Sequence, residues 1–436
     1  MSRTISSQML ERYEKEYDAR KDLQILSHAL SDTKMSDAAY VAENGAKLPM
    51  DFSITVPTTG ITWQKQSGRC WMFATMNLLR ERVIQKCNLK DFSLSGTYLA
   101  FYDKLEKANN FFEAVIHYAD LPVDSRENAY IFANACADGG QWDMAVGLIK
   151  KYGLVPSWIM PETVHSTGTA EWRDVMTEQL DEYGLELRQM LAEGKDVSER
   201  KQEMLSQVYR TLCILYGRPV KEFDFEYTDK DGVFHCDRHL TPKSFYEKYV
   251  GDDLDDYCCV ISSPVHEYKR TYDQPYMGDI IEHEYKWLNV TIEELEDLCL
   301  AMLKDGEGVM FSCDCHGYKN RDKGYWDRDT MDYSSVMGGI PLSMTKAQRM
   351  LTMVSTMNHC MYFCGVNIGE DGHPDRWKIE NSWGEVSGQK GYFVCSQSWF
   401  RDYVMQAIVR KSYLTEEQRA CFEQEPISMT FWDPLA

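Results

Sequence analysis

The chain has 436 residues, of which 44% are hydrophobic and 26% charged, and its formal net charge is −21. This composition is ordinary for a globular protein, and the length suffices for two or three packed units. The negative charge argues against general affinity for nucleic acids or anionic membranes. No apolar run approaches a membrane span, and the charged start MSRTISSQMLERYEKEYDARKDL is unlike a signal peptide. We therefore expect a cytoplasmic protein whose 14 cysteines are reduced thiols.

The first element of functional interest lies in residues 64–83, which read QKQSGRCWMFATMNLLRERV. A loop rich in Gln, Ser and Gly leads into Cys70. The apolar residues that follow recur at helical spacing in one stripe, which consists of Met72, Met76, Leu79 and Val83. Cys70 is therefore predicted to begin a helix. Most free cysteines simply pack in a core, but the unpaired N–H groups at a helix start favour the nucleophilic thiolate. Cys70 is thus a candidate nucleophile.

Along the rest of the chain, helical patterns precede strand patterns. Residues 70–150 read as mostly helical, and the charged stretch 170–216 predicts a helical hairpin for packing or assembly. EFDFEYTDKDGVFHCDR predicts a β-hairpin, and a capping box at Thr291 begins another helix. After Gly308 the segments VMFSCDCH, MYFCGVNI, RWKIENSW and GYFVCS read as strands. We expect an α+β fold of two lobes, with the site in the cleft between them.

A thiolate nucleophile needs a base, a group that orients the base, and donors for the oxyanion. Of the ten histidines, His359 is distinguished by its place at the start of the apolar strand in MNHCMYFCGVNIG. Asn381 follows the strand RWKIE, so adjacent strands would set its amide against one ring nitrogen of His359 and leave the other for Cys70. Trp383 would shield that hydrogen bond from water. Gln64 and the Cys70 backbone N–H would form the oxyanion hole.

Three blocks of this sequence resemble those of papain-like cysteine peptidases, in the bleomycin hydrolase and aminopeptidase C branch. They are Q-x-x-S-G-R-C-W, N-H-C-M-Y-F-C-G and E-N-S-W-G-x-x-x-G-x-x-G-Y, in that order. The stretch CADGGQWDMAV and the final FEQEPISMTFWDPLA also resemble this branch. The resemblance implies an α+β, papain-like two-lobed fold with a helical insertion. The expected units are an N-terminal arm (1–60), a helical lobe with the nucleophile helix (61–165), a helical and hairpin insertion (166–300), a β-rich lobe with the histidine and asparagine (301–425), and a tail in the cleft (426–436).

The resemblance also implies a set of site residues. The catalytic residues are Cys70, His359, Asn381 and Gln64. The substrate-binding residues are Gly139, Gly140, Asn358 and Ala436, although the glycine pair alone would read as a plain turn. The supporting residues are Trp71 and Trp383. The implied activity is aminopeptidase hydrolysis of short peptides through a thioester, by a homohexamer in which Ala436 ends the substrate groove. No cofactor, metal, membrane or nucleic-acid partner is expected.

The chain differs from secreted papain-like enzymes around its nucleophile. Ser67 stands where those enzymes have a disulfide-forming cysteine, which suits a reducing compartment. Cys70 and His359 lie farther apart than the about 130–150 residues typical of papain-like enzymes, and the excess matches the insertion. Arg69 has no explanation from the sequence, because a cation at a helix N-terminus is unfavourable.

Alternative functions are open at this point. Only Leu435 and Ala436 follow Trp432-Asp433-Pro434, whereas tails of the branch usually carry a few more residues there. At about 3.3 Å per extended residue, a shorter tail would shift the cleavage position and give a dipeptide-releasing peptidase or a cysteine endopeptidase. The same triad could serve an acyl transferase, and a binding protein with a vestigial cleft is a further alternative. Motifs of serine hydrolases, P-loop nucleotide hydrolases and HExxH metallopeptidases are absent.

Overall fold

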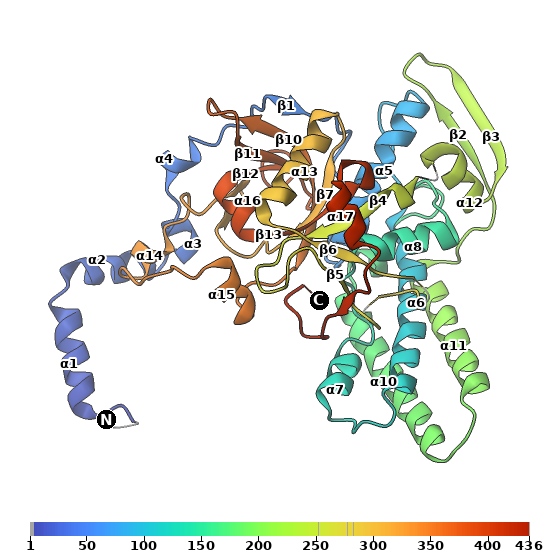
Figure 1. The fold of residues 1–436 in the computed structure, drawn as a ribbon, viewed down its shortest axis with the longest axis horizontal. Coiled ribbons are helices and arrows are strands. Elements are labelled where there is room, and N and C mark those ends of the chain that lie inside the picture. The colour runs from blue at the N-terminus through green and yellow to red at the C-terminus, as the bar shows by residue number, and fades with distance from the viewer. Residues whose placement is uncertain (1–3, 252, 277, 282, 436) are drawn as a thin grey trace.

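The computed structural model describes residues 4–251, 253–276, 278–281 and 283–435. A helical lobe and a β-rich lobe lie side by side, and the first two helices extend away from both (Figure 1). This is the α+β architecture that the order of sequence patterns predicts. Within the described residues, no helix is long and apolar enough to cross a membrane.

The helical lobe is built around α5 (Cys70–Lys86), which begins at Cys70 as predicted. The predicted apolar stripe of α5 is buried, but Asn77, Arg80 and Glu81 are buried as well. The prediction of a single buried stripe is too narrow, because α5 packs against β7 and β10 of the sheet as well as against α6 and α8. The other helices of this lobe are α6 (Gly96–His117), α7 (Arg126–Ala133), α8 (Trp142–Tyr152) and α9 (Val164–Thr167).

The middle of the chain forms a helical hairpin and then a β-hairpin, and both predictions are confirmed. The two hairpin helices pack against α6, and the two hairpin strands pair antiparallel in a sheet of their own. Pro242 occupies the first turn of the short helix that follows. The elements are α10 (Ala170–Ala192), α11 (Ser198–Tyr216), β2 (Phe223–Thr228), β3 (Phe234–Leu240), α12 (Pro242–Phe245), a π-helical turn (Tyr246–Val250) and a 3-10 turn (Leu254–Asp256).

In the described residues a mixed sheet of twelve strands forms the β-rich lobe, in the order β14-β5-β6-β4-β13-β7-β10-β11-β12-β9-β8, with β1 paired to β10. Helices α13 (Ile292–Lys304) and α16 (Gln397–Tyr403) pack against it. The strands are β1 (Ile54–Thr55), β4 (Tyr257–Ile261), β5 (Thr271–Asp273), β6 (Trp287–Asn289), β7 (Val309–Cys313), β8 (Lys319–Asn320), β9 (Tyr325–Trp326), β10 (His359–Ile368), β11 (Pro374–Glu380), β12 (Tyr392–Ser396), β13 (Val404–Arg410) and β14 (Ile427–Ser428).

The prediction that residues 166–300 form only a helical and hairpin insertion is wrong for strands β4, β5 and β6. They lie in the segment that the sequence analysis assigned to the helical and hairpin insertion, yet they extend the main sheet. The reason is the apolar run of β4, which is buried at every position and pairs antiparallel with β13. This run contains Cys258 and Cys259, which were correctly predicted to lie in a buried strand.

The remaining helices are short or peripheral. Neither α1 nor α2 buries a residue, which agrees with their position outside the two lobes (Figure 1). The predicted capping box at the start of α13 is present, since Thr291 and Glu294 each bond the other's backbone N–H. The remaining bounds are α1 (Ser7–Asp18), α2 (Lys21–Leu30), α3 (Met35–Ala38), α4 (Ala42–Gly45), α14 (Tyr333–Val336), α15 (Lys346–Leu351), a 3-10 turn (Lys411–Tyr413) and α17 (Glu416–Cys421).

Candidate active site

The thiol of Cys70 lies at the first residue of α5, at the junction of the two lobes. Cys70 is 9% exposed and lines a cleft of about 1050 Å³. A side-chain hydrogen bond from Cys360 is the main reason that its pKa lies well below the ordinary value, and the nearby His359 acts in the same direction against the effect of burial. This shift favours the thiolate, which is the nucleophilic form.

His359 and Asn381 are brought together by neighbouring strands. His359 begins β10, and the pairing of Tyr362 with Glu380 sets Asn381, just after β11, near the start of β10. The Nε2 atom of His359 lies 2.9 Å from Asn381 Oδ1. Because an amide oxygen only accepts, this contact places a proton on Nε2 and leaves Nδ1 for the thiol. Trp383 stacks on the imidazole with ring centroids 4.9 Å apart.

The side chain of Gln64 is held at both ends. Its Oε1 accepts a hydrogen bond from Ser382 Oγ at 2.7 Å, and its Nε2 donates to the carbonyl oxygen of Ser67 at 2.7 Å. Since Ser382 follows Asn381, the amide of Gln64 is positioned by the same loop that orients the histidine. The NH₂ group carries two hydrogens, so one N–H is left after the bond to Ser67. Gln64 is 9% exposed and lines the cleft with Cys70.

The two glycines of the CADGGQ stretch line the same cleft but serve different purposes. A Cβ on Gly139 would meet nothing within 4 Å, so the space beside it is open. A Cβ on Gly140 would lie 2.4 Å from the Trp71 ring. Gly140 is therefore required by the packing of Trp71, and contact of either glycine with a substrate stays a prediction. Trp71 is fully buried, and its Nε1 donates to the carbonyl oxygen of Asp138 at 3.1 Å.

Asp138 lines the cleft and joins the glycine loop to three other segments. Its carboxylate accepts hydrogen bonds from Lys104 Nζ at 2.7 Å, from Gly68 N at 3.2 Å and from the Thr169 hydroxyl. Burial opposes ionisation, but the Lys104 ammonium outweighs it and holds the pKa of Asp138 below its usual range. The sequence analysis missed Asp138, because an acidic residue before Gly-Gly reads as an ordinary turn.

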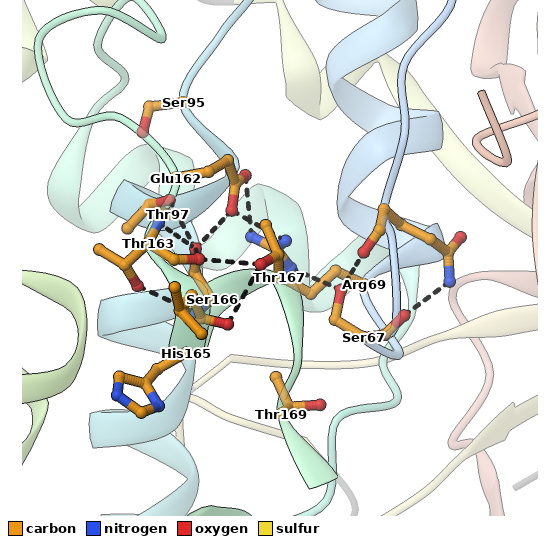
Figure 2. A network of polar contacts seen from close by, with 12 residues as sticks. Ser67, Arg69, Ser95, Thr97, Glu162, Thr163, His165, Ser166, Thr167 and Thr169 are labelled. Atoms are coloured by element: carbon orange, nitrogen blue, oxygen red, sulfur yellow. Dashed lines mark hydrogen bonds and ion pairs between the residues drawn. The ribbon is translucent and has the colours of Figure 1, made fainter. Parts of the chain in front are cut away.

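Arg69, unexplained by the sequence, is one half of an ion pair. Its terminal nitrogens donate to both carboxylate oxygens of Glu162 at 3.1 and 3.0 Å, and its Nε donates to Ser67 Oγ at 2.9 Å. Figure 2 shows this guanidinium between the loop of Ser67 and the segment that begins at Glu162. Ser67 Oγ in turn donates to the carbonyl oxygen of Gln64 at 2.6 Å. Arg69 therefore fixes the loop that carries Gln64.

The C-terminal segment runs along the cleft, with Phe431 among the lining residues. The ring of Phe431 stacks on Tyr130 with centroids 5.5 Å apart, and the guanidinium of Arg126 lies 3.7 Å from the centre of the Trp432 ring. The carbonyl oxygen of Pro434 accepts from Met357 N at 2.8 Å, two residues before His359. Leu435 is fully buried, and Ala436 lies outside the described residues.

Asn358 also lines the cleft, but its side chain is engaged within the protein. Its Oδ1 accepts from Cys315 N at 3.0 Å, and its Nδ2 donates to Asp314 Oδ1 at 2.8 Å and to Thr356 O at 3.0 Å. Contact of this amide with substrate stays a prediction. Across the described part of the chain, no group of three or more His, Cys, Asp or Glu side chains is arranged to hold a metal ion.

A helical lobe and a large sheet, with a thiol, an imidazole and an amide where they meet, make the arrangement of a papain-like cysteine peptidase. The comparisons with known proteins agree. The model of the Peptidase C1-like family matches residues 4–436, and the chain belongs to this family. The chain is 38% identical over 442 residues to aminopeptidase G of Lactobacillus delbrueckii subsp. lactis, covering 100% of each protein.

Further relatives extend the same similarity. The chain is 37% identical over 438 residues to aminopeptidase C of Listeria monocytogenes, covering 100% of this chain and 99% of that protein. The crystal structure of PepW from Lactobacillus rhamnosis superposes with a TM-score of 0.97 at 37% identity, covering 100% of this chain and 99% of that one. The protein is thus a cysteine peptidase, as the three sequence blocks predict.

Proposed function

We propose that this protein is a cysteine aminopeptidase that acts on short peptides through Cys70, His359 and Asn381. The observation that carries the proposal is a depressed thiol pKa at a helix start, in a cleft shared with His359 and partly filled by the C-terminal segment. The relatives named aminopeptidase G and aminopeptidase C support the same activity.

In the proposed reaction, the Cys70 thiolate attacks the carbonyl carbon of the peptide bond. The negative charge that develops on the carbonyl oxygen is stabilised by the Cys70 backbone N–H and the free N–H of Gln64. His359 gives a proton to the departing amine, and a thioester remains on Cys70. His359 then takes a proton from water, the resulting hydroxide attacks the thioester, and the acid product leaves. Asn381 holds the ring in the tautomer that both steps need.

The cleavage position is proposed to be set by residues 431–435. Phe431 of this segment lines the cleft, and the carbonyl oxygen of Pro434 accepts a hydrogen bond from the backbone N–H of Met357, two residues before His359. A peptide that extended far beyond the scissile bond on this side would collide with Phe431, which is buried against Tyr130. The site therefore favours substrates with only one or two residues on the side of the free amine.

Two matched sets of fluorogenic peptides test this proposal under reducing conditions, one set with free amino termini and the other with acetylated termini. We expect turnover of the free-amine set and little turnover of the blocked set, because the blocking group adds length where residues 431–435 lie. The control is Cys70→Ala, which should turn over neither set.

A deletion variant separates the exopeptidase from the alternatives. Removing Leu435 and Ala436 is expected to lengthen the released fragment or to permit cleavage of blocked peptides, measured by mass spectrometry of the products. An unchanged cleavage position would contradict the role given to this segment. Equal turnover of both sets by the intact protein would identify an endopeptidase, and turnover only with an added amine acceptor would identify an acyl transferase.

Gln64→Ala is expected to lower kcat by about 10²–10³-fold, the usual cost of one oxyanion donor. KM should change little, because the hydrogen bond strengthens only as charge develops on the oxygen. Gln66→Ala is the matched control, since Gln66 is an exposed glutamine in the same loop. An equal loss in both variants, or a loss confined to KM, would refute the oxyanion role.

A homohexamer and a cytoplasmic location stay predictions from the resemblance. Light scattering coupled to size-exclusion chromatography would measure the number of subunits directly.

A further inference from the structure

A second thiol lies against the nucleophile. Cys360 follows His359 on β10, is 5% exposed, and lines the same cleft as Cys70. Strand β10 packs against α5, which begins at Cys70, and the interaction of the two thiols lowers the pKa of Cys70 and raises that of Cys360. In the proposed peptidase mechanism Cys360 favours the Cys70 thiolate but takes no part in making or breaking a bond.

The side chain of Cys360 contacts a buried polar pair, Ser312 and Gln406. Ser312 Oγ lies 3.2 Å from Cys360 Sγ and 2.9 Å from Gln406 Oε1. Gln406 Nε2 is buried and has no hydrogen-bond partner among the described residues. The contact with Ser312 holds the Cys360 side chain beside β7, which packs together with β10 against α5.

Cys70 is the thiol at which an oxidant is expected to react. Oxidation by peroxides requires a thiolate that the oxidant can reach. Burial raises the pKa of Cys299, Cys313 and Cys364, so these thiols stay protonated. The pKa of Cys70 is instead lowered, and Cys70 borders the open cleft.

We propose that Cys360 is a resolving cysteine, which forms a reversible disulfide with Cys70 when peroxide oxidises the nucleophile. In the first step the Cys70 thiolate attacks one oxygen of hydrogen peroxide, the O–O bond breaks, hydroxide leaves, and Cys70 becomes a sulfenic acid. In the second step the sulfur of Cys360 attacks the sulfenic sulfur, the S–O bond breaks, and the Cys360 proton leaves with the hydroxyl group as water. A dithiol reductant returns two electrons and two protons and restores both thiols.

The second step requires the sulfur of Cys360 to reach the sulfur of Cys70 and to lose its proton. A disulfide requires sulfur atoms about 2.05 Å apart, so side-chain rotation has to close the remaining distance from hydrogen-bond contact. The hydrogen bond to Cys70, burial and the charge of the Cys70 thiolate all raise the pKa of Cys360, and the part due to the thiolate is gone once Cys70 is a neutral sulfenic acid. The Ser312 hydroxyl acts in the opposite direction and favours the Cys360 thiolate. Formation of the disulfide would keep Cys70 from irreversible oxidation to the sulfinic acid.

Peroxide treatment of the full-length protein tests the proposal. Wild type, Cys360→Ala and Cys315→Ala are exposed to excess hydrogen peroxide until activity is lost, cleared of peroxide and then treated with dithiothreitol. We expect the wild type to regain most of its activity and Cys360→Ala to stay inactive, each relative to its own untreated sample. Cys315 is the matched control, because it is a buried thiol near Cys70 without a hydrogen bond to it. Cys315→Ala should recover like the wild type.

Peptide mapping without reduction gives a second readout that does not depend on peptidase activity. The oxidised wild type should yield one linked peptide pair, Cys70 with Cys360, lighter than the separate peptides by two hydrogens. In Cys360→Ala, Cys70 should appear as the sulfinic acid. The proposal is overturned if wild-type Cys70 is found as sulfinic acid with Cys360 unlinked, if Cys70 is linked to another cysteine, or if Cys360→Ala recovers as fully as the wild type. If the protein turned out to have no peptidase activity, the linked Cys70–Cys360 peptide pair would still be expected. The failure of one proposal can therefore be distinguished from the failure of the other.

Discussion

Replacing Cys70 with alanine is expected to lower kcat by on the order of 10⁶-fold, the loss found when the nucleophile of a comparable triad is removed. The substrate should still bind, because the cleft and the C-terminal segment are untouched. The measurement is kcat and KM on a free-amine fluorogenic peptide, with active-site titration to exclude contaminating wild type. Cys315→Ala is the control, since it removes a nearby thiol that is outside the proposed mechanism.

The same experiment with His359 tests whether the two residues act as one unit. His359→Ala should lose about as much activity as Cys70→Ala, and the double variant should lose no more than either single variant. This result follows if the imidazole serves only to activate the thiol and protonate its leaving group. Losses that multiplied in the double variant would mean that the two side chains work independently, which the proposed triad does not allow.

The positions of Cys70, His359 and Asn381 in the fold could be predicted because each occupies a local pattern that the sequence displays. Cys70 follows a Gly-containing loop at the start of helical spacing, and His359 begins an apolar strand. Asn381 follows a second strand, and the antiparallel pairing of β10 with β11 places it beside His359. In each case the spacing of the apolar residues or the presence of turn residues predicts where a helix or strand begins or ends, and the residue lies at that point.

Other contacts around the cleft could not be predicted, because the residues that make them are distant in sequence. Lys104 and Thr169 meet Asp138 only after α6 and the start of α10 pack together. Cys360 looked like one more apolar strand residue, since a thiol packs as well as it reacts. The packing of Trp71 against Gly140 could not be predicted for a related reason, because the two residues are far apart along the chain.

The ion pair of Arg69 and Glu162 gives the second prediction, and its two halves should behave differently. The side chain of Arg69 is 3% exposed, whereas that of Glu162 is 37% exposed. Glu162→Gln leaves a guanidinium buried without its countercharge, and we expect it to lower the free energy of unfolding by about 3 kcal/mol. Arg69→Met leaves only a carboxylate that water can reach, so its loss should be smaller, about 1–2 kcal/mol.

The effects of the two single variants on kcat should have the opposite order, with the larger loss in Arg69→Met. Arg69 Nε bonds Ser67, and Ser67 bonds the backbone of Gln64, so Arg69→Met loosens the oxyanion donor directly. Glu162→Gln keeps the hydrogen bond from Arg69 Nε to Ser67, so its kcat should fall less than that of Arg69→Met. Urea titration followed by tryptophan fluorescence gives the stabilities, and kcat on a free-amine peptide gives the catalytic effect. The double variant should be more stable than Glu162→Gln alone, because it no longer buries an unpaired charge. If Arg69→Met were instead the less stable single variant and kept full kcat, the pair would serve the packing of the helical lobe and not the position of Gln64.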